Sequence, residues 1–376
     1  MKITILKSSL VQLLQVVAKA IPTKTTKPIL YGVLLQATEE KLIVTAYDLE
    51  IGIQTHLAED ESQEPILQIE RVGSVVLNAK YLLGIVRKLP HRLVRIDVDG
   101  MTATIRSGKA TYTLNGMDSR EYPELPDIEE DKKMTVSSET FLSLIEQTAF
   151  ATATTEIRPV LTGVLMSTPS DRLQFTASDS HRLSTHNLPF ESVSAENIEA
   201  IIPRKSIFEL AKLLGSNDQM IDVFVTDQHF FADLGTTIFY SRLVDGKYPD
   251  ISRIIPTQYE TAVEVDAREF AASIERSALL ARDDENQVIR MSISQEHIDV
   301  SSHSLNIGKV KESFYPSKME GEPLDIASNA HFLLDALKAL GSSKVRIEFT
   351  SSGSAFTLTT VGQDRPLHLI SPVRVV

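Results

Sequence analysis

The chain has 376 residues, a formal net charge of −12 and no cysteine. The lack of cysteine excludes disulfides, thiol catalysis and zinc–thiolate sites, and it is typical of cytoplasmic proteins. The acidic charge argues at first against nucleic-acid binding because a duplex repels an acidic surface, so the placement of the charges has to decide that question. No apolar run approaches the roughly 20 residues that span a bilayer. Met1–Leu6 alternates like a strand rather than a signal peptide, so we expect no membrane partner.

Each third of the chain is predicted to begin with a short strand followed by an amphipathic helix. A serine or aspartate stands near the start of each helix as a candidate N-cap. These candidates are Ser8 or Ser9, Ser137 or Ser138, and Asp266. Apolar residues at three- and four-residue spacing would face the core. The three stripes are Leu10, Leu13, Leu14 and Val17; Phe141, Leu142, Ile145 and Ala149; and Phe270, Ile274 and Ala278.

A second helical pattern recurs at nearly even intervals. In each occurrence four apolar side chains fall at relative positions 0, 3, 4 and 7, on one face of a helix. The occurrences are 125 and 126 positions apart, about one third of the chain, so we interpret the protein as three copies of one module. The three sets are Leu82, Ile85, Val86 and Leu89; Ile207, Leu210, Ala211 and Leu214; and Leu333, Ala336, Leu337 and Leu340.

Strand patterns follow the helices and align between the modules. Pro28–Leu34 matches Pro159–Leu165, and both read as strands. Val44–Asp48 matches Phe175–Asp179, whereas Gln287–Ile293 in the third module keeps only the apolar rhythm. Strict alternation after the second helix of each module predicts strands with one buried face. The alternating residues are Val94, Ile96 and Val98; Ile221, Val223 and Val225; and Val345, Ile347 and Phe349.

Two proline-containing linkers divide the chain. Tyr122–Pro126 is followed by a charged run, and Tyr248–Pro256 repeats the pattern. We therefore predict three modules, 1–126, 130–256 and 257–376, each an α+β unit with two helices packed on antiparallel sheets. Such modules, linked in a row, would form an arc with helices on one side and strands on the other. An arc of this kind needs a partner to close it.

The positive charge is concentrated in the six predicted helices. These helices together carry +3, which leaves −15 for the rest of the chain. Two interpretations stay open: the lysines serve solubility, or a helix-lined surface faces phosphates within an acidic shell. The sequence shows no interleaved aromatics and no recognition-helix pattern, so any DNA contact would be to the backbone and blind to base sequence.

The sequence contains no complete catalytic or metal-binding constellation. Glycine-rich phosphate loops, nucleophile elbows and a His-Glu-x-x-His motif are absent, and no two of the nine histidines lie two to four positions apart. Asp179–Arg182 is the most catalytic-looking segment, but no second histidine or carboxylate cluster completes it. Asp283–Glu285 is a run of three acids that usually forms a solvated turn. We therefore predict a protein that is not an enzyme and that binds no cofactor or metal.

Five segments, in order on a threefold repeat, resemble the bacterial DNA polymerase III beta subunit family of sliding clamps. No single segment is decisive, but the resemblance spans the whole chain. The segments are Thr26–Leu30, Asp118–Pro123, Ala177–Leu183, Asp245–Asp250 and Ser371–Arg374.

The resemblance implies a non-catalytic processivity factor at the cytoplasmic replisome, in a polymerase complex with an associated 3′–5′ exonuclease. The family forms a ring of two head-to-tail subunits around duplex DNA, with the helices lining the hole. Because a ring holds DNA by topology, only its lumen has to tolerate phosphates, and weak contacts there would let it slide. The residues assigned to the lumen are Lys24, Lys27, Lys80, Arg87, Lys88, Lys205, Lys212, Arg276, Arg282 and Lys338.

The resemblance also implies a groove between the second and third modules, where short peptides with a glutamine and terminal hydrophobic residues dock. The implied partners are the replicative polymerase alpha subunit, the clamp loader, and other polymerases and repair proteins. Apolar grooves with polar rims are common peptide sites. The floor would consist of Leu161, Leu183, Pro249, Ile254, Ile370, Pro372 and Val373, and the edges of Ser178, Ser180, His181, Arg182, Arg253, Ser371 and Arg374.

Some positions depart from the family pattern, so peptide preference is expected to differ in detail. Ser180 stands where many relatives have glycine. The remaining departures are the small residues Gly353, Ser354 and Ala355 in the third-module wall of the groove, and Asn286 where a bulky groove residue is expected.

At the seam between two subunits, the resemblance places Tyr112 of one near Leu279 and Leu280 of the other.

Two other classes of function are alternatives. One is a sugar- or nucleotide-processing enzyme that uses Asp179 and His181, in which His181→Ala would abolish turnover without changing peptide affinity. The other is a protein-only scaffold built on the same repeat, which would not be retained on circular DNA.

Overall fold

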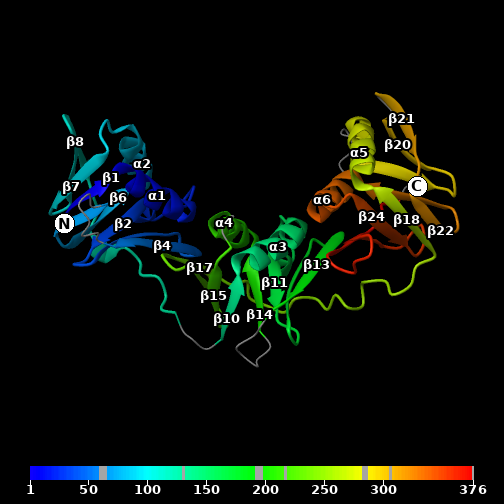
Figure 1. Ribbon diagram of the computed structural model, residues 1–376, viewed down its shortest axis with the longest axis horizontal. Helices are drawn as coiled ribbons and strands as arrows, with labels where there is room; N and C mark the ends of the chain where they lie inside the picture. The colour runs from blue at the N-terminus through cyan, green and yellow to red at the C-terminus, as the bar shows by residue number, and fades with distance from the viewer. Residues whose placement is uncertain are drawn as a thin grey trace. The chain divides into compact units, whose positions relative to one another are not determined.

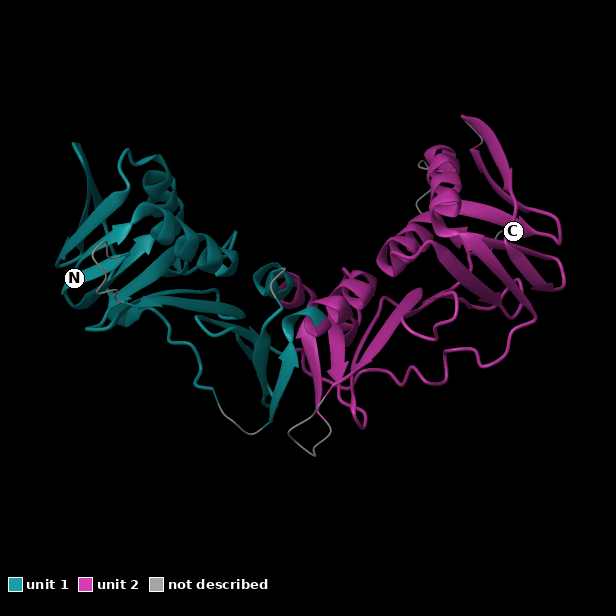
Figure 2. Ribbon diagram, viewed as in Figure 1, with its two compact units in different colours: residues 1–139, 192–196, 209–243 teal, residues 140–191, 197–208, 244–376 magenta. Residues whose placement is uncertain are grey.

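The computed structural model describes residues 1–58, 66–128, 132–190, 198–215, 218–281, 287–304 and 307–374. In this part of the chain it has six α-helices and 26 strands (Figure 1), and the strands pair in antiparallel sheets. The predicted α+β class is therefore confirmed. The chain divides into two compact units (Figure 2): unit 1 is 1–139, 192–196 and 209–243, and unit 2 is 140–191, 197–208 and 244–376. No helix in the described ranges is long and apolar enough to cross a membrane.

The helices bury most of the apolar residues predicted to face the core. The exceptions are Ile85, Leu142 and Ala211, which are half-buried, and Leu144, outside the predicted stripe, is fully buried. Leu82, Ile207 and Leu333, the first members of the three repeated sets, are fully buried. Burial of one such side chain contributes roughly 1.5–3 kcal/mol, so the stripes hold the helices onto the sheets. The helices are α1 (Lys7–Val17), α2 (Ala79–Lys88), α3 (Ser138–Thr148), α4 (Arg204–Leu214), α5 (Ala267–Ala281) and α6 (Ala330–Leu340).

Side chains cap the starts of α2, α5 and α6. Asn78, Asp266 and Asn329 each accept a hydrogen bond from a backbone N–H in the first turn of their helix. Each bond satisfies one of the N–H groups that a helix start leaves without an intrahelical partner. The prediction for Asp266 is therefore confirmed.

The predicted cap of α1 is wrong. Strand β1 (Lys2–Leu6) runs directly into α1, which begins at Lys7. Ser8 and Ser9 therefore lie inside the first turn, and the side chain of Leu6 at the N-cap position makes no capping bond. In the second module α3 begins at Ser138.

Unit 1 contains two sheets. The five-stranded sheet has the order β5-β1-β7-β8-β9, and the eight-stranded sheet has the order β10-β15-β16-β17-β4-β3-β2-β6. Helices α1 and α2 pack against each other, and α1 also packs on β3 and β4. The remaining strands of the unit are β2 (Gly32–Ala37), β3 (Lys41–Tyr47), β4 (Ile51–Ala58), β5 (Leu67–Arg71), β6 (Gly73–Asn78), β7 (Leu93–Asp99), β8 (Thr102–Ser107), β9 (Ala110–Asn115), β10 (Lys133–Ser137), β15 (Met220–Val225), β16 (His229–Asp233) and β17 (Thr237–Arg242).

Unit 2 also contains two sheets. The nine-stranded sheet has the order β14-β11-β12-β13-β26-β25-β24-β18-β22, and the four-stranded sheet has the order β21-β20-β19-β23. Helices α5 and α6 pack on these sheets through one core that includes Phe270, Leu337 and Ile347. The strands are β11 (Gly163–Ser167), β12 (Arg172–Ser178), β13 (Arg182–Pro189), β14 (Glu199–Pro203), β18 (Thr261–Asp266), β19 (Val288–Ile293), β20 (Ile298–Ser304), β21 (Gly308–Phe314), β22 (Lys318–Gly321), β23 (Leu324–Asn329), β24 (Lys344–Phe349), β25 (Phe356–Thr360) and β26 (Leu367–Ile370).

Each unit contains one junction between consecutive modules, and the two junctions are built alike. In unit 1 the fourth strand of the first module, β4, pairs with the last strand of the second, β17. In unit 2 the fourth strand of the second module, β13, pairs with the last strand of the third, β26. Backbone hydrogen bonds thus run through both junctions, so each larger sheet is shared by two modules.

The start of Pro28–Leu34 and of Pro159–Leu165 differs from the strand prediction. Both segments open with a 3₁₀ turn, at residues 28–31 and 159–162, because proline suits the first position of a helical turn. The strands begin at Gly32 and Gly163. An added Cβ would lie 2.4 Å from Val76 Cγ1 at Gly32, and 2.6 Å from an Ile201 methyl at Gly163, so a larger residue at either position would force its neighbours to shift.

Candidate functional site

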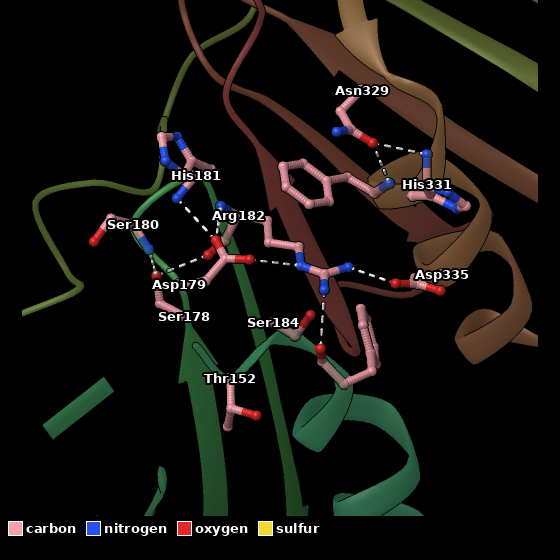
Figure 3. Close-up of polar contacts among 12 residues, drawn as sticks. Thr152, Ser178, Asp179, Ser180, His181, Arg182, Ser184, Asn329, His331 and Asp335 are labelled. Atoms are coloured by element: carbon pink, nitrogen blue, oxygen red, sulfur yellow. Dashed lines mark hydrogen bonds and ion pairs between the residues drawn. The ribbon is translucent and has the colours of Figure 1, made fainter. Parts of the chain in front are cut away.

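The segment Asp179–Arg182 forms a tight turn between β12 and β13 (Figure 3). Asp179 Oδ1 accepts hydrogen bonds from the backbone N–H groups of His181 (2.9 Å) and Arg182 (3.0 Å). Ser178 Oγ donates to the Arg182 carbonyl at 2.7 Å. Ser180 sits at the top of the turn with φ of 79°, in the left-handed region that favours glycine. This geometry explains why glycine suits the position.

The first module repeats this turn. Asp48 Oδ1 accepts hydrogen bonds from the N–H groups of Glu50 (2.9 Å) and Ile51 (2.6 Å), and Leu49 has φ of 78°. The aspartate at the two aligned positions is therefore a turn former in both modules.

Arg182 joins three elements of unit 2. Its guanidinium donates from Nε to Asp179 Oδ2 (3.0 Å), from Nη1 to Asp335 Oδ2 on α6 (2.6 Å) and from Nη2 to the Phe150 carbonyl (3.0 Å). It also stacks over the Phe332 ring, with its central carbon 4.5 Å from the ring centroid. Because the side chain is only 12% exposed, these contacts fix the turn against α6.

The same contacts argue against the catalytic interpretation of this segment. The Asp179 carboxylate is committed to two backbone N–H groups and to Arg182, so it is not placed as a base for His181. The described residues also hold no group of three histidines or carboxylates that could bind a metal ion. Asp283–Glu285, the other acidic candidate, lies outside the described residues.

A cavity of about 500 Å³ opens beside the turn. Leu161, 4% exposed, forms part of its apolar wall, and Ile157 projects an 88% exposed side chain at its edge. Such an exposed isoleucine next to a recess is typical of a surface that a partner covers. The complete lining is Thr152, Ala153, Thr154, Thr155, Ile157, Arg158, Leu161, Asp179, Ser180, His181, Arg182 and Phe332.

The C-terminal strand brings further predicted groove residues to this turn. Arg182 and Leu183 pair with Ile370 and Leu369 across β13 and β26, and the Ser371 N–H donates to the His181 carbonyl at 2.8 Å. Leu183 and Ile370 are buried, so they support the floor from within the fold. Of the remaining tail residues, Pro372 and Val373 are half-buried and Arg374 is exposed.

Pro249, Arg253 and Ile254 lie on the linker that follows β17 and do not belong to the cavity lining in the described part of the chain. Arg253 is 89% exposed and reaches Asp250 only at 3.7 Å. Ile254 is 50% exposed. The neighbouring Ile251 packs on the clusters of both Leu161 and Leu183, so the linker passes close to the floor.

The sequence interpretation missed the contribution of α6. Phe332 of α6 lines the cavity. Asp335 of α6 pairs with Arg182 (Figure 3). The apolar spacing from Leu333 to Leu340 predicted this helix, but no sequence pattern placed it beside the Asp179 turn. Asn286 lies outside the described residues. Of the small residues in the third-module wall, Ala355 packs on the Leu183 cluster.

Most residues assigned to a DNA-facing surface are exposed, and some of them form ion pairs. Arg276 pairs with Glu312 at 2.6 Å, and Lys212 pairs with Glu209 at 2.7 Å. Arg282 lies outside the described residues. The other exposed members are Lys24, Lys27, Lys80, Arg87, Lys88, Lys205 and Lys338.

The residues assigned to the seam lie at two sheet edges. Tyr112, 41% exposed, is in β9, the edge strand of the five-stranded sheet in unit 1. Leu279, 52% exposed, and the half-buried Leu280 are in α5, which packs on β20 and the edge strand β21 in unit 2.

Comparisons with known proteins agree with this architecture. The N-terminal, central and C-terminal domains of the DNA polymerase III beta subunit match residues 1–126, 135–250 and 252–374. The beta sliding clamp of Bacillus subtilis is 39% identical over 376 residues, covering all of both chains, and that of Staphylococcus aureus is 38% identical over 375 residues, covering 100% of this chain and 99% of the relative.

Solved structures give the same result. The Bacillus subtilis DNA polymerase sliding clamp has a TM-score of 0.97 at 38% identity, and the Pseudomonas aeruginosa beta subunit has 0.93 at 27%, each with complete coverage of both chains. The protein is therefore a polymerase processivity clamp without a catalytic role of its own. It belongs to the DNA polymerase III beta subunit family, the bacterial beta sliding clamps.

Proposed function

We propose that two copies of this chain close into a head-to-tail ring around duplex DNA, with modules 1–126, 130–256 and 257–376 as the repeated segments. The observation that carries the proposal is the strand pairing at the two junctions. Each junction pairs the fourth strand of one module with the last strand of the next, β4 with β17 and β13 with β26. In the described part of the chain, one fourth strand and one last strand remain at sheet edges without a partner of this kind.

The two strands are β21, the fourth strand of the third module, and β9, the last strand of the first. Antiparallel pairing of β21 with β9 of a second copy would repeat the internal junction a third time. Twofold symmetry would then supply the second seam and remove both exposed edges, which otherwise favour aggregation. Tyr112 on β9 and Leu279 and Leu280 beside β21 would pack at this seam.

Light scattering tests the dimer. We expect a particle of about 83 kDa, twice the 41.7 kDa of one chain, at micromolar concentration. Leu279→Asp combined with Leu280→Asp should give folded monomers, whereas Met220→Asp, at a 64% exposed side chain away from the seam, should stay dimeric. A wild-type monomer at this concentration would contradict the ring.

The exposed basic residues support a DNA-facing surface on the helices. Lys80, Arg87 and Lys88 lie on α2, and Lys338 lies on α6. In an overall acidic protein, this lining would give weak contacts to the DNA backbone that fall steeply with salt because they depend on counterion release. Retention would therefore come from enclosure rather than from affinity.

A comparison of circular and linear DNA separates these two sources of retention. Protein loaded onto a closed circle by an ATP-driven loader should stay bound at salt concentrations that abolish binding to a short linear duplex, and cutting the circle should release it. Charge reversal at Lys24, Arg87, Lys88 and Lys205 should weaken linear binding and leave the dimer intact. Equal salt sensitivity on uncut circles and linear duplexes would rule out enclosure.

We further propose that the cavity beside the Asp179 turn, together with the linker and the C-terminal tail, binds short peptides with a glutamine and terminal hydrophobic residues. The partners would be the replicative polymerase alpha subunit, the clamp loader and other polymerases and repair proteins of the cytoplasm. The apolar wall at Leu161 and Phe332 and the exposed Ile157 support an apolar anchor, and the polar turn supports hydrogen bonds at the rim.

Calorimetry with such a peptide tests the groove, with an expected micromolar affinity of roughly −8 kcal/mol. Deletion from Ser371 onward should remove most of the binding because it takes away a wall held by the Ser371–His181 and Val373–Ala327 backbone bonds. Ile254→Ser should weaken binding, and Met220→Ser should not. Undiminished binding after the deletion would refute the assignment.

A further inference from the structure

A second recess of about 960 Å³ lies in unit 2 at the far end of β13 from the Asp179 turn. Strand pairing between β13 and β26 runs from Arg182↔Ile370 to Thr185↔Leu367 and then stops. Beyond this point β13 continues to Pro189, while residues 361–366 before β26 are outside any strand. The recess lies where the two strands diverge, about five residues or ~16 Å along β13 from Arg182. It is therefore separate from the cavity beside the Asp179 turn, and the end of the linker, Ile255 and Pro256, borders it.

Two arginines line this recess without a carboxylate partner. Arg172 donates from Nε to Asn187 Oδ1 (2.9 Å) and from Nη2 to the Asn187 carbonyl (3.5 Å). Arg365 donates from Nη1 to the Asp364 carbonyl (2.7 Å), and its Nε is buried without a hydrogen-bond partner. Within the described ranges, neither guanidinium forms an ion pair with an acidic side chain.

The third arginine of the recess, Arg346, does form ion pairs with acidic side chains. Arg346 is held by Glu264 (3.4 Å), Glu320 (2.9 Å) and Glu348 (2.9 Å). Glu348, the carboxylate that also lines the recess, is therefore bound to Arg346. Asp364 contributes the other acidic side chain of the lining. Both Asp364 and Arg172 are exposed, so water screens the effect of each on Arg365.

His186 adds a buried polar group to the same wall. Its side chain is 7% exposed, and its Nδ1 is buried without a hydrogen-bond partner. Burial, followed by the charges of Arg365 and Arg172, lowers the pKa of His186 to about 4, so the ring is neutral at pH 7. Burial also lowers the pKa of Arg365; the neighbouring Asp364 opposes this effect, and Arg172 adds to it. The positive groups destabilise one another, and an anion between them would remove that repulsion.

We propose that this recess binds a phosphate-class oxyanion between the Arg172 and Arg365 guanidiniums, with His186 as a third hydrogen-bonding group. Guanidinium forks match the oxygen spacing of phosphate and can donate two parallel hydrogen bonds. The recess is larger than one phosphate, so the group could be free phosphate or the phosphate end of a nucleotide. Phosphate bound here would bridge β12 and the segment before β26, which belong to different modules, and would stabilise their junction.

Titration of the full-length protein with inorganic phosphate, at constant ionic strength set by chloride, tests the proposal. We expect saturable heat in calorimetry and a saturable rise in the unfolding temperature. Arg365→Gln and Arg172→Gln should each weaken phosphate binding by roughly tenfold or more. Arg253→Gln, at an exposed arginine of the same unit, should not. A parallel titration with a nucleoside triphosphate separates the sources: tighter binding than phosphate indicates a nucleotide, and equal binding indicates free phosphate.

Nuclear magnetic resonance of the His186 ring gives a readout that does not depend on any variant. Saturating phosphate should raise the pKa of His186 by about one unit or more, because the anion neutralises Arg172 and Arg365 and favours the charged ring. An unchanged His186 pKa would overturn the proposal. So would an equal phosphate effect on the wild type and both variants, since phosphate stabilises any protein weakly by exclusion from its surface.

Discussion

Replacement of Arg182 by methionine tests whether this buried cation holds the groove together. The substitution keeps a long apolar side chain against Phe332 but removes the bonds to Asp179, Asp335 and the Phe150 carbonyl. Removal of one partner from a buried ion pair usually costs about 3–5 kcal/mol because a charge stays behind unpaired. Here Asp335 is 44% exposed and contributes little, and Asp179 keeps its two backbone hydrogen bonds. We therefore expect a loss of about 2–4 kcal/mol.

Arg253→Met is a matched control. Both arginines pair with an aspartate three residues earlier, but the Arg253 side chain is 89% exposed and that of Arg182 is 12% exposed. The exposed pair should contribute less than about 0.5 kcal/mol. Because the two ion pairs share the same sequence spacing, the difference in free energy lost between the two variants measures the effect of burial.

Native-state hydrogen exchange gives the local free energy directly, because amides of β13 and α6 exchange through opening of this region. A loss of 2–4 kcal/mol corresponds to exchange roughly 30- to 900-fold faster in Arg182→Met, with little change in the five-stranded sheet of unit 1. If β13 exchanged at the same rate in both variants, Arg182 would contribute no more than a surface ion pair and the argument from its burial would be wrong.

Three further outcomes follow from individual contacts. Burial, followed by the charges of His186 and Arg182, lowers the pKa of His368 to about 3, and that of His186 is about 4. Because unfolded histidine titrates near 6.5, the unfolded chain binds these protons first. As the pH is lowered from about 6.5 to 4 in phosphate-free buffer, the free energy of unfolding of unit 2 should therefore decrease. Each of the two histidines contributes up to ~1.4 kcal/mol per pH unit, so the decrease should be less steep in His368→Gln. Urea titrations should show that Gly84→Ala, in α2 with open space around it, raises the free energy of unfolding by ~0.5–1 kcal/mol. Gly32→Ala should lower it, because the added methyl group would clash with Val76. Asn329→Ala should cost ~1 kcal/mol and speed exchange in the first turn of α6, and unchanged exchange would show that its two capping bonds do not stabilise the helix.

The sequence by itself determined the repeat, the helix positions and the side of each helix that is buried. These features depend on residues close in the chain: apolar side chains three and four apart must lie on one face of a helix. The aligned segments ending in Asp48 and Asp179 also predicted a shared local structure, which the two turns confirm in their hydrogen bonds. The α1 cap was wrong because strand and helix join without a turn, which side-chain preference does not reveal.

Only the tertiary structure decided which distant segments meet. Arg182 contacts Asp335 across 153 residues, and the pairing of β13 with β26 brings His181 to Ser371. No periodicity records such contacts, because they depend on the order of strands in a sheet rather than on local spacing. The same reason explains why Phe332 was missed in the cavity wall, and why the recess of Arg172, His186 and Arg365 could not be seen in the sequence. There, three unremarkable polar residues become a cluster only because two paired strands diverge.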